Sequence, residues 1–191
     1  MSPYFEQNLV GQWYGSSLIP HGSYSARPGY PNYPHHGISL EPSLLSGGAS
    51  GLDDDDILGK IRGSELWVVN SRRRNGLIIH KEFYTEFAGP GAAIGGGLDQ
   101  DCRAVIPLGN LSLISPSSAE EQQKALRIRL QWIRLTQNFT DKPVPIDRAR
   151  MILEQFKSYF DQAIVDQVPD EAFALLVGVL PYTVRRARAL V

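Results

Sequence analysis

The change in residue type near residue 116 constrains the fold of this chain most. Residues 51–115 combine glycine with β-branched and aromatic residues, which favour strands and turns. Residues 116–191 are rich in residues that favour helices. Strands followed by helices, rather than alternating with them, are typical of an α+β fold. We therefore predict a small central β-hairpin or sheet region over residues 51–115 and a helical C-terminal domain over residues 116–191.

The first fifty residues have a different composition, dense in glycine, proline, serine and tyrosine. Such a segment loses much backbone entropy on ordering and gains little apolar burial in return. We predict a flexible segment over residues 1–50, with "LLSGGASG" as a linker. Its tyrosine and proline content also suits a tail that binds a protein partner.

The composition of the whole chain suits a soluble cytoplasmic protein. Its 191 residues are 42% hydrophobic, which is enough for a core, and its net charge is only −1. We find no signal peptide and no apolar run of the roughly 18–20 residues that a membrane helix needs. Cys102 is the single cysteine, so it has no partner for an internal disulfide or a zinc site. We expect no metal and no cofactor.

The central region predicts a β-hairpin around the basic turn "SRRRNG". Residues 66–69 and 77–87 are rich in apolar and aromatic residues, and Asn75-Gly76 between them suits a tight turn. A third strand is expected in "CRAVIPLGNLSLI", and the glycine-rich "GPGAAIGGG" is expected to be a loop. In a DNA-binding protein, Arg72, Arg73 and Arg74 at the hairpin tip could also reach a phosphate.

Two longer helices are expected before the C-terminus. Ser117 and Ser118 precede Glu120 and Glu121 at capping-box spacing, so a helix should run through "AEEQQKALRIRLQWIRL", although its alternation also suits a strand. A second helix over residues 147–165, capped by Asp147, is predicted by an apolar stripe. The stripe consists of Ala149, Ile152, Leu153, Phe156, Phe160, Ala163 and Ile164.

The last 22 residues, 170–191, predict two short helices joined by a turn. Asp170 and Glu171 favour a helix N-terminus, Gly178 ends that helix, and Pro181 suits the first turn of the next. This order describes a helix-turn-helix. The residues expected to pack inside it are Phe173, Ala174, Val177, Gly178, Val184 and Ala187. The residues expected on the exposed face of the second helix are Tyr182, Thr183, Arg185, Arg186 and Arg188.

The segment "EAFALLVGVLPYTVRRARAL" resembles the helix-turn-helix signature of bacterial transcription regulators and site-specific recombinases. Ala174, Gly178 and Val184 carry the resemblance, which covers about 22 residues and identifies no single family. Leu180 departs from it, because a small polar cap is usual there. A second departure is that the chain ends directly after the motif, with no room for a wing.

The resemblance implies that the second helix enters the major groove of double-stranded DNA. Arg185 and Arg186 would then read bases, whereas Tyr182, Thr183 and Arg188 would contact phosphates or edge groups. One such helix reads few base pairs, so we expect a homodimer or help from another surface. The function predicted is a sequence-specific, non-catalytic transcription regulator.

Two other functions remain open. The C-terminal helices could dock a protein partner, which would make the chain an adaptor. The central region could hold an enzyme site in which His80 and Glu82 exchange protons, but the sequence places no nucleophile beside them.

Two further motifs are given structural interpretations. "GPGAAIG" matches the glycine spacing of a dinucleotide loop, but no βαβ unit surrounds it. The acidic run at residues 53–56 is interpreted as a loop that caps the helix "ILGKI", because adjacent carboxylates do not have the alternate spacing of a calcium loop.

Overall fold

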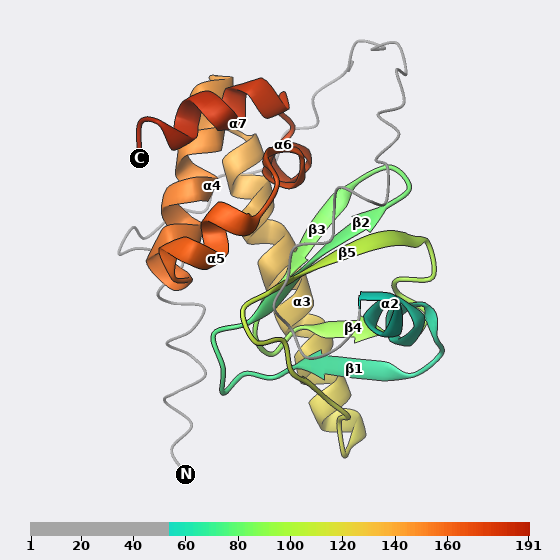
Figure 1. The fold of residues 1–191 in the computed structure, drawn as a ribbon. Helices are drawn as coiled ribbons and strands as arrows, with labels where there is room; N and C mark the ends of the chain where they lie inside the picture. The colour runs from blue at the N-terminus through green and yellow to red at the C-terminus, as the bar shows by residue number, and fades with distance from the viewer. Residues whose placement is uncertain (1–53) are drawn as a thin grey trace, which may run out of the picture.

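The computed structural model describes residues 54–191 as a mixed α+β protein with two small antiparallel sheets and, within those residues, six helices (Figure 1). The predicted flexible segment over residues 1–50, with its suggested role in partner binding, lies outside the described residues. Within the described part, no helix is both long and apolar enough to cross a membrane. The α+β class predicted from the sequence is confirmed.

The β region contains one helix and two three-stranded sheets. The first sheet has the strand order β4-β1-β6, and the second has the order β3-β2-β5. Helix α2 packs against β5 and β4. The bounds are α2 (Asp54–Arg62), β1 (Leu66–Val69), β2 (Gly76–Lys81), β3 (Thr85–Ala88), β4 (Ala93–Gly95), β5 (Cys102–Leu108) and β6 (Leu113–Ile114). Asp54 is the first residue of α2, so the acidic run enters that helix rather than preceding it as a loop.

The predicted hairpin around "SRRRNG" is wrong. β1 pairs with β4 and β6, whereas β2 pairs with β3 and β5. Residues 76–80 of β2 are all buried, so this strand requires a neighbour on each side. The Asn75 amide nitrogen donates to the carbonyls of Asn70 and Arg73, at 2.9 and 3.0 Å, and thereby holds a loop between the two sheets. The hairpin present instead joins β2 to β3.

The glycine-rich segment is more ordered than predicted. Three of its residues form β4, which pairs with β1, although the sequence indicated a loop. Gly95 ends this strand with φ +72°, and a Cβ there would lie 2.6 Å from the Glu65 carbonyl oxygen. Only glycine accommodates both the conformation and the close approach. The glycines therefore serve the packing of the strand.

The helical part consists of α3 (Ala119–Thr140), α4 (Pro145–Tyr159), α5 (Gln162–Gln167), α6 (Asp170–Val177) and α7 (Pro181–Arg188). The helical interpretation of α3 is confirmed, since the Ser118 hydroxyl accepts from the Glu121 amide at 3.2 Å. The single helix predicted over residues 147–165 is wrong, because α4 ends at Tyr159 and its C-cap, Phe160, has an extended backbone. Val144 is the N-cap of α4, and Asp147 lies inside its first turn without capping it.

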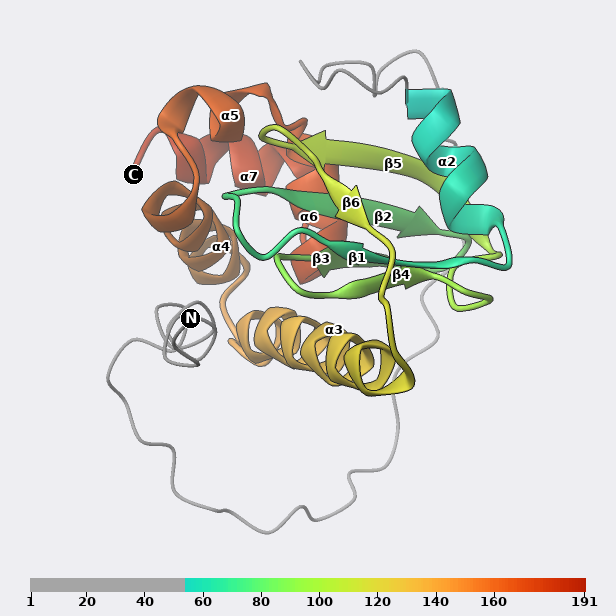
Figure 2. The same cartoon turned by 90° about the horizontal axis from the view of Figure 1, so that it is seen from below.

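A chain of aromatic rings joins the β region to the helices. Phe87 of β3 contacts Trp132 of α3 and Phe156 of α4, with centroid distances of 5.3 and 5.0 Å. Phe156 in turn contacts Phe173 of α6 at 5.0 Å. Figures 1 and 2 show α3 beside the sheets and α4–α7 gathered at one end of the molecule. This continuous core fixes α6 and α7 relative to the strands.

Candidate nucleic-acid interface

Helices α6 and α7 are joined by a tight turn over residues 178–180. Gly178 ends α6 in the left-handed conformation, with φ +63° and ψ +50°. The Val179 amide donates to the Ala174 carbonyl at 3.0 Å, which satisfies the end of α6. Pro181 occupies the first turn of α7, whose N-cap Leu180 provides no side-chain hydrogen bond. The turn thus depends on a glycine and a proline that fix the backbone.

The residues expected to pack inside this pair of helices are buried. Val184 and Ala187 of α7 are fully buried, and α7 packs against both α4 and α6. Val179 is partly buried against the same core. The buried residues of α6 from the predicted set are Phe173, Ala174 and Val177. The inner face of α7 is therefore used by the fold, and only its outer face is available to a partner.

The outer face of α7 presents Tyr182, Arg185 and Arg186 to solvent. The Arg186 guanidinium lies over the Tyr182 ring, 5.9 Å from its centroid, which limits the freedom of both side chains. Thr183 is half-buried, and its amide donates to the Leu180 carbonyl at 2.8 Å. Arg185 is 71% exposed and 3.3 Å from Asp170. An exposed pair of this kind contributes roughly 0–1 kcal/mol, so Arg185 can exchange it for another anion.

Arg188 is held within the protein. Its Nε donates to Asp170 at 2.7 Å, and its terminal nitrogens donate to the carbonyls of Val165 and Val168, at 3.2 and 2.6 Å. The guanidinium also lies 5.3 Å from the Phe173 ring centroid. These contacts tie α7 to α6 and to the end of α5. Arg188 therefore contributes to the position of α7, whatever α7 binds.

We expect Arg188→Ala to lower the free energy of unfolding by about 1.5–3 kcal/mol, because it leaves the carbonyls of Val165 and Val168 without a charged donor and Asp170 with only the exposed Arg185. Urea unfolding followed by circular dichroism measures the change. Arg186→Ala is the matched control, since Arg186 is exposed on the same helix and should change stability by about 0.5 kcal/mol or less. Equal effects of the two substitutions would contradict the structural role of Arg188.

The chain was compared with protein-family models, curated proteins and solved structures, and no match was found. Inferences about function therefore depend on the residues and geometry of this chain.

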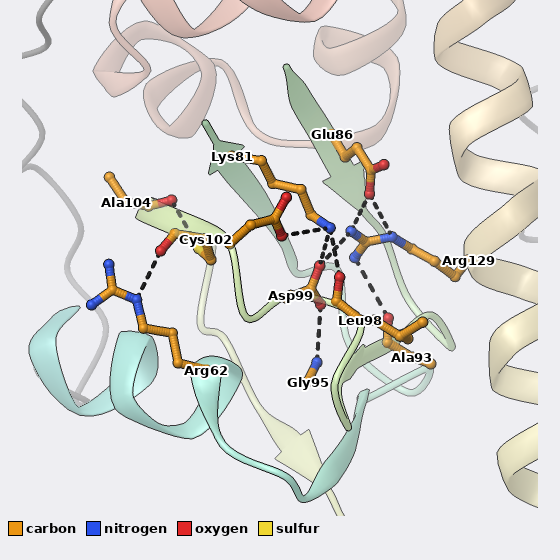
Figure 3. Close-up of polar contacts among 11 residues, drawn as sticks. Arg62, Lys81, Glu86, Ala93, Gly95, Leu98, Asp99, Cys102, Ala104 and Arg129 are labelled. Carbon is orange, nitrogen blue, oxygen red and sulfur yellow. Dashed lines mark hydrogen bonds and ion pairs between the residues drawn. The ribbon is translucent and has the colours of Figure 1, made fainter. Parts of the chain in front are cut away.

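A cluster of buried charges lies where the β region meets α3, away from α6 and α7 (Figure 3). The Asp99 carboxylate is fully buried between Lys81, at 3.2 Å, and Arg129 of α3, at 3.3 Å. It also accepts from the Gly95 amide at 3.0 Å. Two nitrogens of Arg129, Nε and Nη2, donate to the same carboxylate oxygen of Glu86. The cluster links β2, β3, β4 and α3.

Lys81 is held as a cation by this cluster. Burial alone would lower its pKa, but the attraction of Asp99 and hydrogen bonds with Asp101 and Asp99 outweigh burial and raise the pKa above its ordinary range. A lysine with a raised pKa is neither a nucleophile nor a base near neutral pH. The geometry therefore suits a structural network, in which the charges fix the loop after β4.

The geometry around His80 differs from the predicted acid–base pair. Its Nδ1 lies 2.9 Å from the Thr85 hydroxyl, whereas Glu82 pairs with Arg103 at 3.3 Å. Burial lowers the pKa of His80 to about 4. Burial and the Asp99 charge raise the pKa of the Cys102 thiol to about 11. Near neutral pH the imidazole is thus neutral and the thiol protonated, so neither group is activated for catalysis.

Proposed function

We propose that the chain is a sequence-specific DNA-binding regulator whose helix α7 lies in the major groove. The observation that supports this most is the division of α7 into a buried face, Val184 and Ala187, and an exposed face with Arg185 and Arg186. An arginine can form two hydrogen bonds with guanine, and such a contact contributes about 1–3 kcal/mol of discrimination.

The residues of the exposed face have distinct roles in this proposal. Arg186, ordered by Tyr182, reads a base edge, and Arg185 releases Asp170 to read a neighbouring base or contact a phosphate. Thr183 contacts the sugar-phosphate backbone at the edge of the groove. Arg188 acts indirectly by holding α7 in place. With only 8 residues, α7 spans few base pairs, so a homodimer on a two-part site provides the specificity.

The test is selection of bound sequences from a randomised duplex pool, followed by fluorescence anisotropy at two salt concentrations. We expect a two-part motif for the wild type and at least about a tenfold loss of affinity for it in Arg185→Ala/Arg186→Ala. Arg127→Ala/Arg134→Ala is the matched control, because it removes the same charge from exposed positions on α3.

The two double variants separate base reading from general attraction. Loss of the motif only in the α7 variant supports the proposal. Equal losses in both variants would indicate diffuse attraction to phosphates, which depends strongly on salt and carries no sequence information. Failure of the wild type to enrich any motif would contradict the proposal.

A second function, docking of a protein partner, is favoured by exposed apolar residues at both ends of α7. Leu180 is 68% exposed and Leu190 is 66% exposed. Exposed leucines beside arginine and tyrosine suit a protein interface better than a phosphate backbone. In that case a purified partner would bind the wild type and lose affinity for Leu180→Ser/Leu190→Ser, while Arg185→Ala/Arg186→Ala would have the smaller effect.

A further inference from the structure

A cleft of about 380 Å³ lies where β3, α3 and the turn between α6 and α7 meet. Its position follows from the packing of α6 and α3 against β3. No residue of α7 lines the cleft, and Glu86 is the one member of the charge cluster that does. The residues of the cleft that determine its chemistry are Tyr84, Glu86, Ile133, Thr136, Thr140 and Leu175.

Three side chains of the cleft, Glu86, Thr136 and Thr140, offer hydrogen-bond acceptors. The Thr136 hydroxyl donates to the Trp132 carbonyl at 3.1 Å, and the Thr140 hydroxyl donates to the Gln137 carbonyl at 2.7 Å. The hydrogens of both hydroxyls are thus used within α3, while their lone pairs remain able to accept. Glu86 uses one carboxylate oxygen, Oε2, for both contacts with Arg129, and its Oε1 can accept from a ligand.

The charge that lines the cleft favours a cation. Glu86 is the one residue with a full charge among those that line it. The network behind Glu86 adds the cations Lys81 and Arg129 and the carboxylates Asp99 and Asp101, and Arg148 adds a cation beside Gly178, so the groups around the cleft are neutral in sum. The preference for a cation therefore comes from Glu86, the charge that lines the cleft itself.

The C-terminal end of helix α3 increases the preference of the cleft for a cation. Thr136, Gln137 and Thr140 belong to its last turns, where the helix dipole places partial negative charge. The last turn of α3 contains no basic residue that would offset this charge. At α6, by contrast, Arg148 already donates to the Val177 carbonyl at 3.4 Å. A cationic ligand near Thr140 would complement the dipole of α3.

The walls of the cleft are apolar. Ile133 and Leu175 provide aliphatic surface, and Tyr84 provides a ring that is 48% exposed. Leu175 is the one exposed large apolar residue of α6. A ligand that buried these surfaces would gain roughly 25 cal/mol per Å² of apolar area. The cleft therefore combines an anionic, acceptor-rich end with apolar walls.

We propose that this cleft binds a small organic amine. The ammonium group contacts Glu86 Oε1 and the hydroxyl of Thr140 or Thr136, and the hydrocarbon part lies against Ile133, Leu175 and the Tyr84 ring. Because α6 supplies Leu175 and Leu176, a bound amine joins α6 to β3 and α3. Binding of the amine does not depend on whether α7 binds DNA, so the two proposals can fail separately.

The test uses three probes of similar shape and different charge: phenethylamine, 2-phenylethanol and 3-phenylpropionate. Each is titrated at neutral pH into the full chain while chemical shifts of threonine and leucine methyl groups are recorded. We expect the amine to bind at least about tenfold more tightly than the alcohol, and the carboxylate to bind more weakly than both. Equal affinities for amine and alcohol, or no binding of the amine at millimolar concentration, would overturn the proposal.

Two pairs of variants locate the site. Leu175→Arg places a cation at the cleft and should abolish amine binding, whereas Leu190→Arg makes the same change at an exposed position of the C-terminus and should not. Thr140→Val should lower the affinity for the amine several-fold, and Thr183→Val, outside the cleft, should leave this affinity unchanged. Binding that persists in Leu175→Arg, with the protein folded by circular dichroism, would also overturn the proposal.

Discussion

We expect Asp99→Ala to lower the free energy of unfolding by about 3 kcal/mol, because Lys81 and Arg129 lose the fully buried carboxylate that they share and keep only Asp101 and Glu86 as partners. It also removes the acceptor of the Gly95 amide, which lies 3.0 Å from the carboxylate. The loop between β4 and β5 would then lose its connection to α3. Urea unfolding at neutral pH, followed by tryptophan fluorescence, measures the change.

Asp101→Ala is the matched control for this prediction. Both carboxylates lie 3.2 Å from the Lys81 ammonium, but Asp99 is fully buried and Asp101 is 45% exposed. Since solvent screens an exposed pair, the loss for Asp101→Ala should be about 1 kcal/mol or less. Similar losses for the two substitutions would show that burial does not determine the strength of this network.

Local signals in the sequence predicted the C-terminal helices well. Gly178 and Pro181 act on their own backbone, through a left-handed conformation and a fixed φ, so their effect needs no knowledge of distant residues. The Ser118 cap of α3 is equally local. By contrast, Phe160 and Asp161 interrupt an apolar stripe that continues in phase, and no proline or glycine marks that break. The stripe alone therefore predicted a single long helix where the structure has two shorter ones.

Strand pairing could not be predicted in the same way. The local turn signal of Asn75-Gly76 suggested that β1 and β2 pair, yet β2 requires partners on both sides because it is buried. Its pairing with β5 joins residues far apart in the sequence, such as Gly76 and Leu108. Tertiary packing decided the outcome against the local preference.

The charge network and the cleft also depend on contacts between residues far apart in the sequence. Glu86 and Arg129 are 43 residues apart in sequence, and neither residue forms part of a spacing motif. One signal was available for Arg129, which is a charged residue between the apolar positions Ile128 and Leu130. That alternation also suits a strand, and it did not indicate a buried cation. The cleft depends on the packing of α6 against β3 and α3, which no local signal specifies.

Acidification should destabilise the folded protein through His80. In the unfolded chain an imidazole is protonated below a pKa of about 6.5, whereas in the folded protein burial lowers the pKa of His80 to about 4. Between these values the unfolded state binds more protons, so stability is highest above about pH 6.5 and falls as the pH approaches 4. The expected loss over this range is about 3 kcal/mol. Urea unfolding at a series of pH values measures it.

Two variants assign this pH dependence to His80. His80→Phe keeps a ring of similar size on β2 and should remove most of the slope between about pH 5 and 6.5, where few carboxylates titrate. Replacing His21, His35 and His36 with glutamine should retain the slope, because these are the other histidines of the chain. A slope that persists in His80→Phe and disappears in the triple variant would assign the proton uptake to the N-terminal segment. Retention of the slope only when His80 is present would show that the β2 imidazole is neutral in the folded protein, as its burial requires.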